Sequence, residues 1–185
     1  MNSVFVSGDY LFTGAGDDTA KMWDADPSSG NFGSLIRTFE GHSNSVNSVY
    51  VSGGMLFTGS SDTTAKMWNI STGALKRTFS GHDGRNYYVY SVFVSGDHLF
   101  TGSEDKTVKM WDINATVNDN GVVDTPMRTF SGHSKPVRRV FVSGDYLFTA
   151  SFDNTAKMWD INATVNDNGV VAVSYTHLRA HETEA

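Results

Sequence analysis

Three stretches of this 185-residue chain each combine a histidine, a serine and an aspartate. In a hydrolase triad the histidine takes the proton of the serine hydroxyl, and the aspartate orients the histidine. The residue types alone therefore allow an intrinsic hydrolase, which has to be weighed against other functions. The three sets are His42, Ser60 and Asp62, then His82, Ser103 and Asp105, and finally His133, Ser151 and Asp153.

A tryptophan follows each of these sets, and this favours a structural role. Trp68, Trp111 and Trp159 recur in step with the three sets, and a buried indole N–H needs a hydrogen-bond acceptor. A chain of bonds from the tryptophan through serine and histidine to aspartate would satisfy all four groups. Catalysis needs no threefold repetition, and the sequence has no Gly-x-Ser-x-Gly nucleophile elbow. We interpret the three sets with their tryptophans as structural tetrads, and we predict no catalytic residue.

The elements that must position these residues occur in four copies. Each of the four tryptophans ends a Lys-Met-Trp triplet, and a Leu-Phe-Thr run precedes each triplet at a constant distance. Within a copy, two β-rich runs are joined by Ser-Gly-Asp or Ser-Gly-Gly, which is typical of a tight hairpin. Four short strands per copy and no helical period predict an all-β chain of four-stranded antiparallel sheets. Because the strands are apolar on both faces, we expect the sheets to stack on one another.

These copies resemble WD40 repeats over residues 1–171, and the resemblance implies an arc of four β-propeller blades. It places the Gly-His pair between two blades, the aspartate in the turn after the second strand, and the tryptophan at the end of the third. The first blade is degenerate, because Ala15 replaces the serine and no Gly-His precedes it, so we expect an incomplete tetrad there. The last blade is incomplete. The blades span approximately residues 1–40, 46–80, 88–131 and 137–171.

The resemblance also implies that partners dock on the top surface and at the central channel. The positions that it places there differ between copies while the scaffold hardly changes, as expected of a binding face on a fixed frame. Tyrosine and arginine are also frequent at interaction hot spots. The alternatives are tyrosines that cap a neighbouring blade and arginines that are merely solvated. The candidate partner-binding residues are Asn47, Ser61, Arg85, Tyr87, Tyr88, Tyr90, Glu104, Arg138 and Phe152.

Composition restricts the partners further. The formal net charge is −6 and no basic run occurs, so we expect no nucleic acid partner. No apolar stretch reaches the length of a membrane span, and without cysteine there is no disulfide or thiol chemistry. The identical segments 113–123 and 161–171 are rich in Asn and Asp but miss the spacing of a calcium loop. We expect them to form hairpins on the bottom rim, and we predict neither a metal nor a cofactor.

Both ends of the sequence depart from the repeat. The run Val173–Thr183 resembles a translated sequencing adapter, so we predict that residues 172–185 are a non-native tail and that its His177 and His181 bind no metal. Met1 aligns with Val46, so the first Gly-His and the strand before it are missing. We expect that neither end supplies the outer strand of the last blade and that further blades of the ring are absent.

The sequence therefore favours a protein–protein interaction scaffold or adaptor that uses the top face and central channel. The alternative is a regulatory or substrate-recruiting module of a larger enzyme, of the ubiquitin-ligase receptor or kinase type. In both cases the partners are proteins or peptides. The lack of a signal sequence predicts an intracellular protein, cytoplasmic or nuclear.

Overall fold

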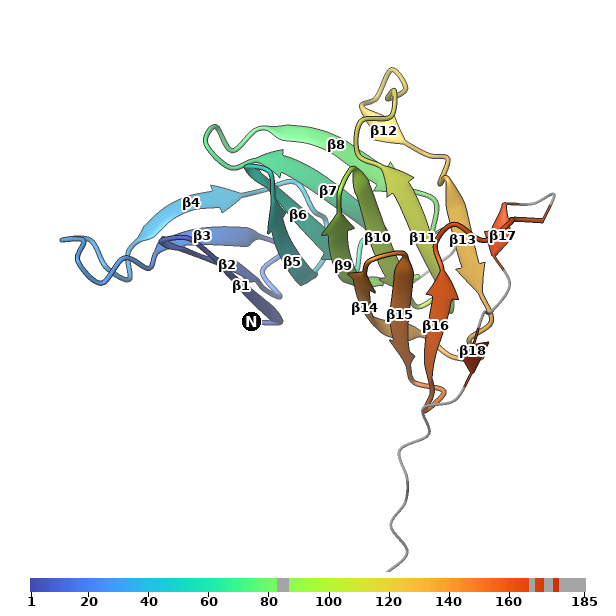
Figure 1. Ribbon diagram of the computed structural model, residues 1–185. Helices are drawn as coiled ribbons and strands as arrows, with labels where there is room; N and C mark the ends of the chain where they lie inside the picture. Colours follow the sequence, from blue (N-terminus) through green and yellow to red (C-terminus); the bar gives the residue numbers. More distant parts are fainter. Residues whose placement is uncertain (83–86, 167–168, 172–174, 177–185) are drawn as a thin grey trace, which may run out of the picture.

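The computed structural model describes residues 1–82, 87–166, 169–171 and 175–176, and every regular element in these ranges is a β-strand (Figure 1). The described residues contain no helix of the length and hydropathy that crossing a membrane requires. Four sheets follow one another along the chain in an open arc, with the first strand of each sheet on the concave side (Figure 1). Each sheet is a blade, as the repeats predict, and we number the blades 1 to 4 along the chain.

Each blade is built from four antiparallel strands in chain order. Blade 1 contains β1 (Ser3–Ser7), β2 (Tyr10–Gly14), β3 (Ala20–Asp24) and β4 (Leu35–Phe39). Blade 2 contains β5 (Val46–Ser52), β6 (Met55–Ser60), β7 (Thr64–Asn69) and β8 (Leu75–Ser80). Blade 3 contains β9 (Val89–Ser95), β10 (His98–Ser103), β11 (Thr107–Asp112) and β13 (Arg128–Ser131). Blade 4 contains β14 (Val137–Ser143), β15 (Tyr146–Ser151), β16 (Ala156–Asp160) and β18 (Tyr175–Thr176).

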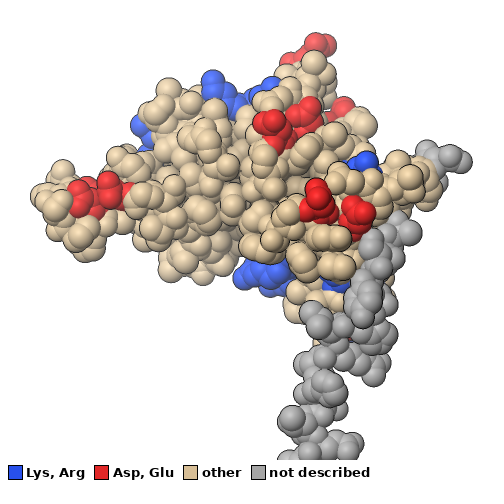
Figure 2. All heavy atoms as spheres, viewed as in Figure 1, with Lys and Arg blue, Asp and Glu red and all other residues tan. Residues whose placement is uncertain are grey.

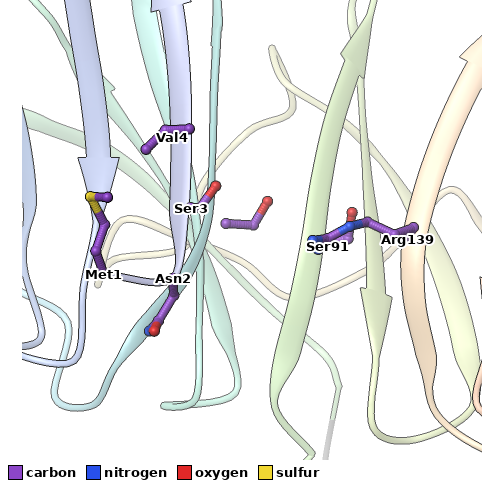
Figure 3. Close-up of a pocket in the computed structure, with 7 residues that line it drawn as sticks. Met1, Asn2, Ser3, Val4, Ser91 and Arg139 are labelled. Atoms are coloured by element: carbon purple, nitrogen blue, oxygen red, sulfur yellow. The ribbon is translucent and has the colours of Figure 1, made fainter.

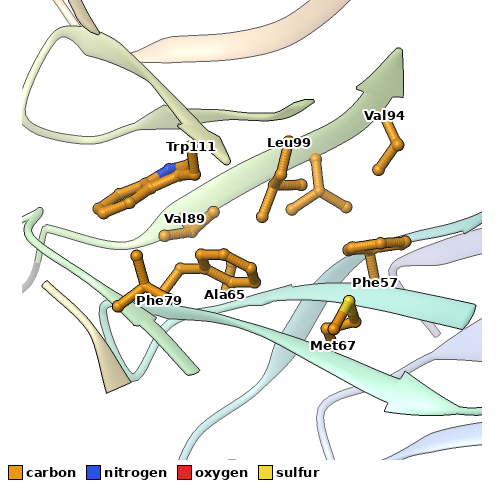
Figure 4. Close-up of a cluster of buried hydrophobic side chains, with 10 residues drawn as sticks. Phe57, Ala65, Met67, Phe79, Val89, Val94, Leu99 and Trp111 are labelled. Carbon is orange, nitrogen blue, oxygen red and sulfur yellow. The ribbon is translucent and has the colours of Figure 1, made fainter. Parts of the chain in front are cut away.

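The apolar side chains of neighbouring blades interlock to form the core. Between blades 2 and 3, Phe57, Met67 and Phe79 pack in one buried cluster with Val89, Leu99 and Trp111, and Trp111 lies at the Phe79 end of it (Figure 4). Equivalent clusters lie between blades 1 and 2 and between blades 3 and 4. A middle blade is therefore covered on both faces, which explains why its strands are apolar on both faces.

A glycine in the second strand of blades 1 to 3 lets the next blade approach closely. A Cβ atom on Gly59 would lie 2.8 Å from Cγ1 of Val89, and one on Gly102 would lie 2.9 Å from Cγ1 of Val140. Gly14 stands in the same relation to Val46, at 2.8 Å. Blade 4 has Ala150 at this position, on its open face.

Blades 3 and 4 each send one short strand to the outer edge of the preceding blade. The loop of blade 3 contributes β12 (Val122–Val123), which pairs in parallel with β8 of blade 2, and the loop of blade 4 contributes β17 (Val170–Val171), which pairs in parallel with β13 of blade 3. A turn does form in the first of these loops, since Asn118 N–H donates to the carbonyl of Val122 at 3.0 Å. The valines after the turn, however, extend a neighbouring sheet, with Val123 and Val171 buried.

The last blade has an outer strand, contrary to our expectation that neither end supplies one. β18 pairs antiparallel with β16, and Thr176 lies opposite Lys157 as Thr78 lies opposite Lys66 in blade 2. The free edge of β16 needs backbone partners, and the backbone of a segment close in sequence meets that need whatever its side chains. The adapter origin of residues 172–185 stays a prediction, and most of them, with His177 and His181, lie outside the described residues.

Candidate functional site

The tetrads form, but a threonine takes the place that we predicted for serine. In blade 2, Nδ1 of His42 lies 2.6 Å from Oδ2 of Asp62, and Nε2 lies 2.7 Å from Oγ1 of Thr58. The indole N–H of Trp68 donates to the same Thr58 oxygen at 2.9 Å. With the proton on Nδ1, His42 donates to Asp62 and accepts from Thr58, so the tetrad runs Trp68–Thr58–His42–Asp62.

Strand register explains why the serine was the wrong residue. Trp68 lies opposite Leu56 on the paired strand, so Thr58 is its diagonal neighbour on the same face. Ser60 is two residues further along that strand, out of reach of the indole. Its hydroxyl instead donates to the carbonyl of Asn44 at 2.8 Å and accepts the N–H of Asp62 at 3.0 Å. Ser60 therefore fixes the turn that carries Asp62.

The same correction applies to the other two complete copies. In blade 3 the histidine and tryptophan share the hydroxyl of Thr101, and in blade 4 that of Thr149. Ser103 and Ser151 bond to the loop after the histidine, as Ser60 does. The tetrads are thus Trp68–Thr58–His42–Asp62 in blade 2, Trp111–Thr101–His82–Asp105 in blade 3 and Trp159–Thr149–His133–Asp153 in blade 4.

Electrostatics favour a charged aspartate in these tetrads. Burial acts to raise the pKa of Asp62, but the hydrogen bond from His42, with bonds from Thr64, holds that pKa well below its usual range. The pKa values of Asp105 and Asp153 are lowered in the same way by their histidines and threonines, against the effect of burial. Burial lowers the pKa of His133 in spite of Asp153, so this ring is uncharged at neutral pH.

Thr58, His42 and Asp62 have the connectivity of a hydrolase triad, but no substrate can reach them. Thr58 is completely buried, and the side chain of His42 is 1% exposed. The indole N–H of Trp68 already donates to the Thr58 hydroxyl oxygen, which is the atom that would have to attack a substrate. The arrangement therefore stabilises the blade, since it pairs every buried polar group that it contains.

Each tetrad also connects its blade to the preceding one. The Trp68 ring stands edge-on to Phe39 of blade 1, with the ring centroids 6.1 Å apart, and to His42 at the same distance. Gly41 lies directly over the indole, where an added Cβ would be 3.1 Å from Cη2 of Trp68. The Gly-His pair is therefore required by packing at the blade junction as well as by hydrogen bonding.

Blade 1 lacks the histidine and keeps only part of the tetrad, as we expected. The indole N–H of Trp23 donates to Thr13 Oγ1 at 2.9 Å. Asp17 has turned outward, where it pairs with Lys21 and accepts from Thr19. The Lys21 and Thr19 bonds lower the pKa of Asp17 to about 2.

The candidate binding residues of blades 3 and 4 meet on the top face, which is the edge of the blades that carries the aspartate turns. The guanidinium carbon of Arg138 lies 4.0 Å from the ring centroid of Tyr90 and 4.8 Å from that of Phe152. The Tyr90 hydroxyl donates to the Glu104 carboxylate. The ring of Tyr88 stands edge-on to Tyr90 at 6.1 Å. We call Tyr88, Tyr90, Glu104, Arg138 and Phe152 the top-face cluster.

Phe152 is the exposed part of this cluster, with 53% of its surface accessible, and the other members are half-buried. Burial and the Glu104 carboxylate raise the pKa of Tyr90 to about 12, so its hydroxyl stays protonated and continues to donate. The Arg138 guanidinium lies over both rings, where the attraction between a cation and a ring face favours its position.

Comparison with known proteins identifies the family. The sequence matches the family described as "WD domain, G-beta repeat" at residues 2–24, 33–69, 73–112 and 124–160. The chain belongs to the WD40 repeat family. A search of curated proteins gave no match.

Solved structures with a similar fold include the following three. The WD40 β-propeller domain of Doa1 is 27% identical with a TM-score of 0.73, over 95% of this chain and 53% of that one. The computationally designed Ika4 protein is 25% identical with a TM-score of 0.70, over 87% and 91%. The designed Ika8 protein, at 24% identity and a TM-score of 0.68, covers 93% and 47%. The chain thus spans about half the length of the Doa1 domain and of Ika8.

WD40 propeller domains generally serve as non-catalytic scaffolds for protein interactions, but not every predicted contact residue of this chain is free for that purpose. Asn47 donates from Nδ2 to Ser61 Oγ at 2.9 Å and to the carbonyl of Val89 in blade 3 at 3.1 Å. Asn2 makes the equivalent bond to the carbonyl of Val46. Asn47 therefore joins blades 2 and 3, and Ser61 helps to hold its side chain in place. Tyr87 is exposed, and Arg85 lies outside the described residues.

Sequence reasoning missed one feature of the channel. Ser3, Ser48 and Ser91 occupy one position of successive WD40 blades, and each accepts the N–H of a valine in the following blade, as Ser48 Oγ does from Val92 at 3.1 Å. Blade 4 carries Arg139 there. These residues line an open hollow of about 490 Å³ on the concave side, with Arg139 across from Ser3 (Figure 3). The repetition of serine at this position was the available signal.

Proposed function

We propose that this chain is a protein-interaction scaffold that binds a peptide or a protein segment at the top-face cluster. The observation that carries the proposal is the position of Arg138 over the rings of both Tyr90 and Phe152. A folded chain gains little by leaving a phenylalanine 53% exposed, whereas an exposed aromatic ring beside an ordered arginine is typical of an interaction hot spot.

The contrast between blades supports this choice of surface. At the positions of Tyr90 and Glu104, blade 2 has Asn47 and Ser61, whose polar groups are used by the protein itself. In blades 3 and 4 the same two positions carry large side chains, and these extend the surface toward solvent. The departure from the repeat is therefore concentrated on one half of the top face.

The chemistry of the cluster suggests the chemistry of the partner. Phe152 and Tyr88 offer apolar ring surface, and the edge of the Arg138 guanidinium offers charged donors for a carboxylate or phosphate. We propose that the bound segment carries an acidic or phosphorylated residue next to an apolar one. The same recruitment serves a stand-alone adaptor and a recruiting module of a larger enzyme.

The charge distribution is consistent with a protein partner rather than a nucleic acid. The chain has a formal net charge of −6. On the face shown in Figure 2, Lys and Arg side chains lie in separate groups and are interspersed with acidic ones. Binding to a phosphate backbone relies on a continuous basic surface, which this face does not offer.

A peptide-array screen with the purified chain tests the proposal. Phe152→Ala and Arg138→Ala should weaken the selected peptides by roughly ten-fold or more, because they remove hot-spot contacts. Phe32→Ala, which removes another exposed ring (64% accessible) in the loop between β3 and β4, is the matched control. All three variants should keep the melting temperature of the unchanged chain. If Phe32→Ala weakens binding as much as Phe152→Ala does, the top-face cluster is not the site.

A further inference from the structure

The three junctions between blades repeat one arrangement, in which the following blade inserts valines against a phenylalanine of the preceding blade. The phenylalanines are Phe12, Phe57 and Phe100, none more than 1% exposed. In the junction between blades 3 and 4, Val140 and Val142 pack in one cluster with Phe100, and each valine is 6% exposed. Each blade thus has a donor face with valines and an acceptor face with a phenylalanine.

A row of aromatic rings crosses all three junctions as well. Phe5 contacts Tyr50 with ring centroids 4.8 Å apart, Tyr50 contacts Phe93 at 4.8 Å, and Phe93 contacts Phe141 at 5.1 Å. Tyr50 and Phe93 each touch a ring on both sides. Phe141 has a ring neighbour on the blade 3 side, and 55% of its surface is exposed.

The two ends of the arc expose the two complementary halves of this arrangement. Blade 1 exposes its donor face, where Val4 and Val6 are 55% and 64% accessible. Blade 4 exposes its acceptor face, where Phe148, at the position of Phe57 and Phe100, is 39% accessible beside Phe141. An apolar surface of this kind on a folded protein marks an interaction site.

We propose that two copies of this chain associate head to tail, with the donor face of blade 1 on each copy against the acceptor face of blade 4 on the other. Val6 of one copy would then meet Phe148 of its partner copy, as Val142 meets Phe100 within the chain, and Phe141 would continue the ring row onto Phe5. This proposal does not depend on the proposed function of the top face.

The size of the arc favours a closed pair over an open chain of copies. The arc matches 47% of the Ika8 chain and 53% of the Doa1 propeller domain. Two arcs are therefore about as long as one of these chains. A head-to-tail contact closes on itself when the rotation that it imposes completes a turn. A closed pair would bury both donor and both acceptor faces, whereas an open chain of copies always leaves one of each exposed.

Two substitutions make this junction weaker than the internal ones. Ala150 replaces the glycine that admits the valine of the next blade, so a shift is needed where Gly102 leaves room. Arg139 replaces the serine that accepts a valine N–H, the bond that Ser91 makes with Val140 at 3.2 Å. An arginine side chain has no hydrogen-bond acceptor, so it cannot replace the serine in this bond. The association is therefore reversible.

Analytical ultracentrifugation of the full 20.2 kDa chain over a range of concentrations tests the proposal. We expect a monomer–dimer equilibrium at about 0.15 M salt, where repulsion between the acidic copies is screened. Val6→Glu and Phe148→Lys should each weaken the dimer by about 100-fold or more, because each leaves a charge in an apolar contact. Val117→Glu, in the loop after β11 of blade 3, replaces another exposed valine (41% accessible) and should leave the dimer unchanged.

Mixing the two disrupted variants distinguishes this geometry from other modes of association. In a mixed pair, the carboxylate introduced by Val6→Glu faces the ammonium group introduced by Phe148→Lys at one junction, and the other junction is unaltered, so the dimer should reappear. Ala150→Gly should tighten the dimer. A wild-type chain that stays monomeric, larger open assemblies, or a mixture that stays monomeric would each overturn the proposal and assign these faces to another occupant. The near-ultraviolet circular dichroism of the tryptophans verifies that each variant is folded.

Discussion

The indole of Trp68 donates to the hydroxyl of Thr58 at 2.9 Å, diagonally across the β6–β7 pair. The same oxygen meets Nε2 of His42. One threonine therefore satisfies two buried polar groups from different parts of the chain, and it joins the third strand of the blade to the loop that arrives from the blade before it.

Thr58→Val should therefore be costly, because it removes the hydroxyl while keeping the shape of the side chain. It leaves the Trp68 N–H and one nitrogen of His42 without a partner, and we expect a loss of about 2–4 kcal/mol in the free energy of unfolding. Thr13→Val is the matched control, since in blade 1 only the Trp23 N–H loses its partner. Urea denaturation measures both variants. Equal losses would show that the histidine takes no part in the network.

Stability should fall in two steps as the pH is lowered. The pKa of His133 is lowered in the folded state, so the unfolded chain takes up its proton first and stability decreases below about pH 6.5. The pKa values of Asp62, Asp105 and Asp153 are also lowered, so a second loss begins below about pH 4. Urea denaturation between pH 7 and pH 3 measures these losses.

The control for the first step is His133→Gln, which removes the titrating group and should flatten the curve between pH 7 and pH 5. If stability rises as the pH falls through this range, histidine protonation is favoured in the folded state and the assignment is wrong.

Thr63 occupies a strained backbone position and offers a gain in stability. Its φ angle is 73°, a left-handed conformation that a β-branched residue adopts at a cost, and Asn154 holds the equivalent position of blade 4 at 61°. Thr63→Asn should raise the free energy of unfolding by about 0.5–1 kcal/mol, since asparagine tolerates this region. The reverse exchange, Asn154→Thr, should lower it by a similar amount. Thermal melts of both variants check the sign, and two shifts in the same direction would contradict this explanation.

The short strand β12 should contribute to stability through Val123, which is 4% exposed in the core between blades 2 and 3. Val123→Ala should cost about 1.5–3 kcal/mol, because it removes buried methyl groups and leaves a cavity. Val117→Ala in the same loop, at a position that is 41% exposed, should change stability by less than about 0.5 kcal/mol. Chemical denaturation measures both. If the two variants lose the same amount, the pairing of β12 with β8 does not matter to the fold.

The sequence by itself determined the repeat, the strands and the hairpins, because these depend on neighbours within a few positions. The Ser-Gly-Asp turns and the Lys-Met-Trp runs fix a register that is the same in each of the four copies, with Ser7 opposite Tyr10 and Ser95 opposite His98. The two apolar faces of each strand predicted the stacking of blades for the same reason. The incomplete tetrad of blade 1 also followed from the absence of its histidine.

Only the tertiary structure decided which polar atoms meet. The indole N–H of Trp68 donates to Thr58 rather than to Ser60, because Thr58 is the diagonal neighbour of Trp68 on the paired strand. The spacing of residues along one strand does not show this. The bond from Asn47 to the carbonyl of Val89 and the stacking of Arg138 on Tyr90 join residues of different blades. Such contacts depend on how closely and at what angle two blades pack. That geometry results from all the side chains of the junction together, and no local pattern in the sequence encodes it.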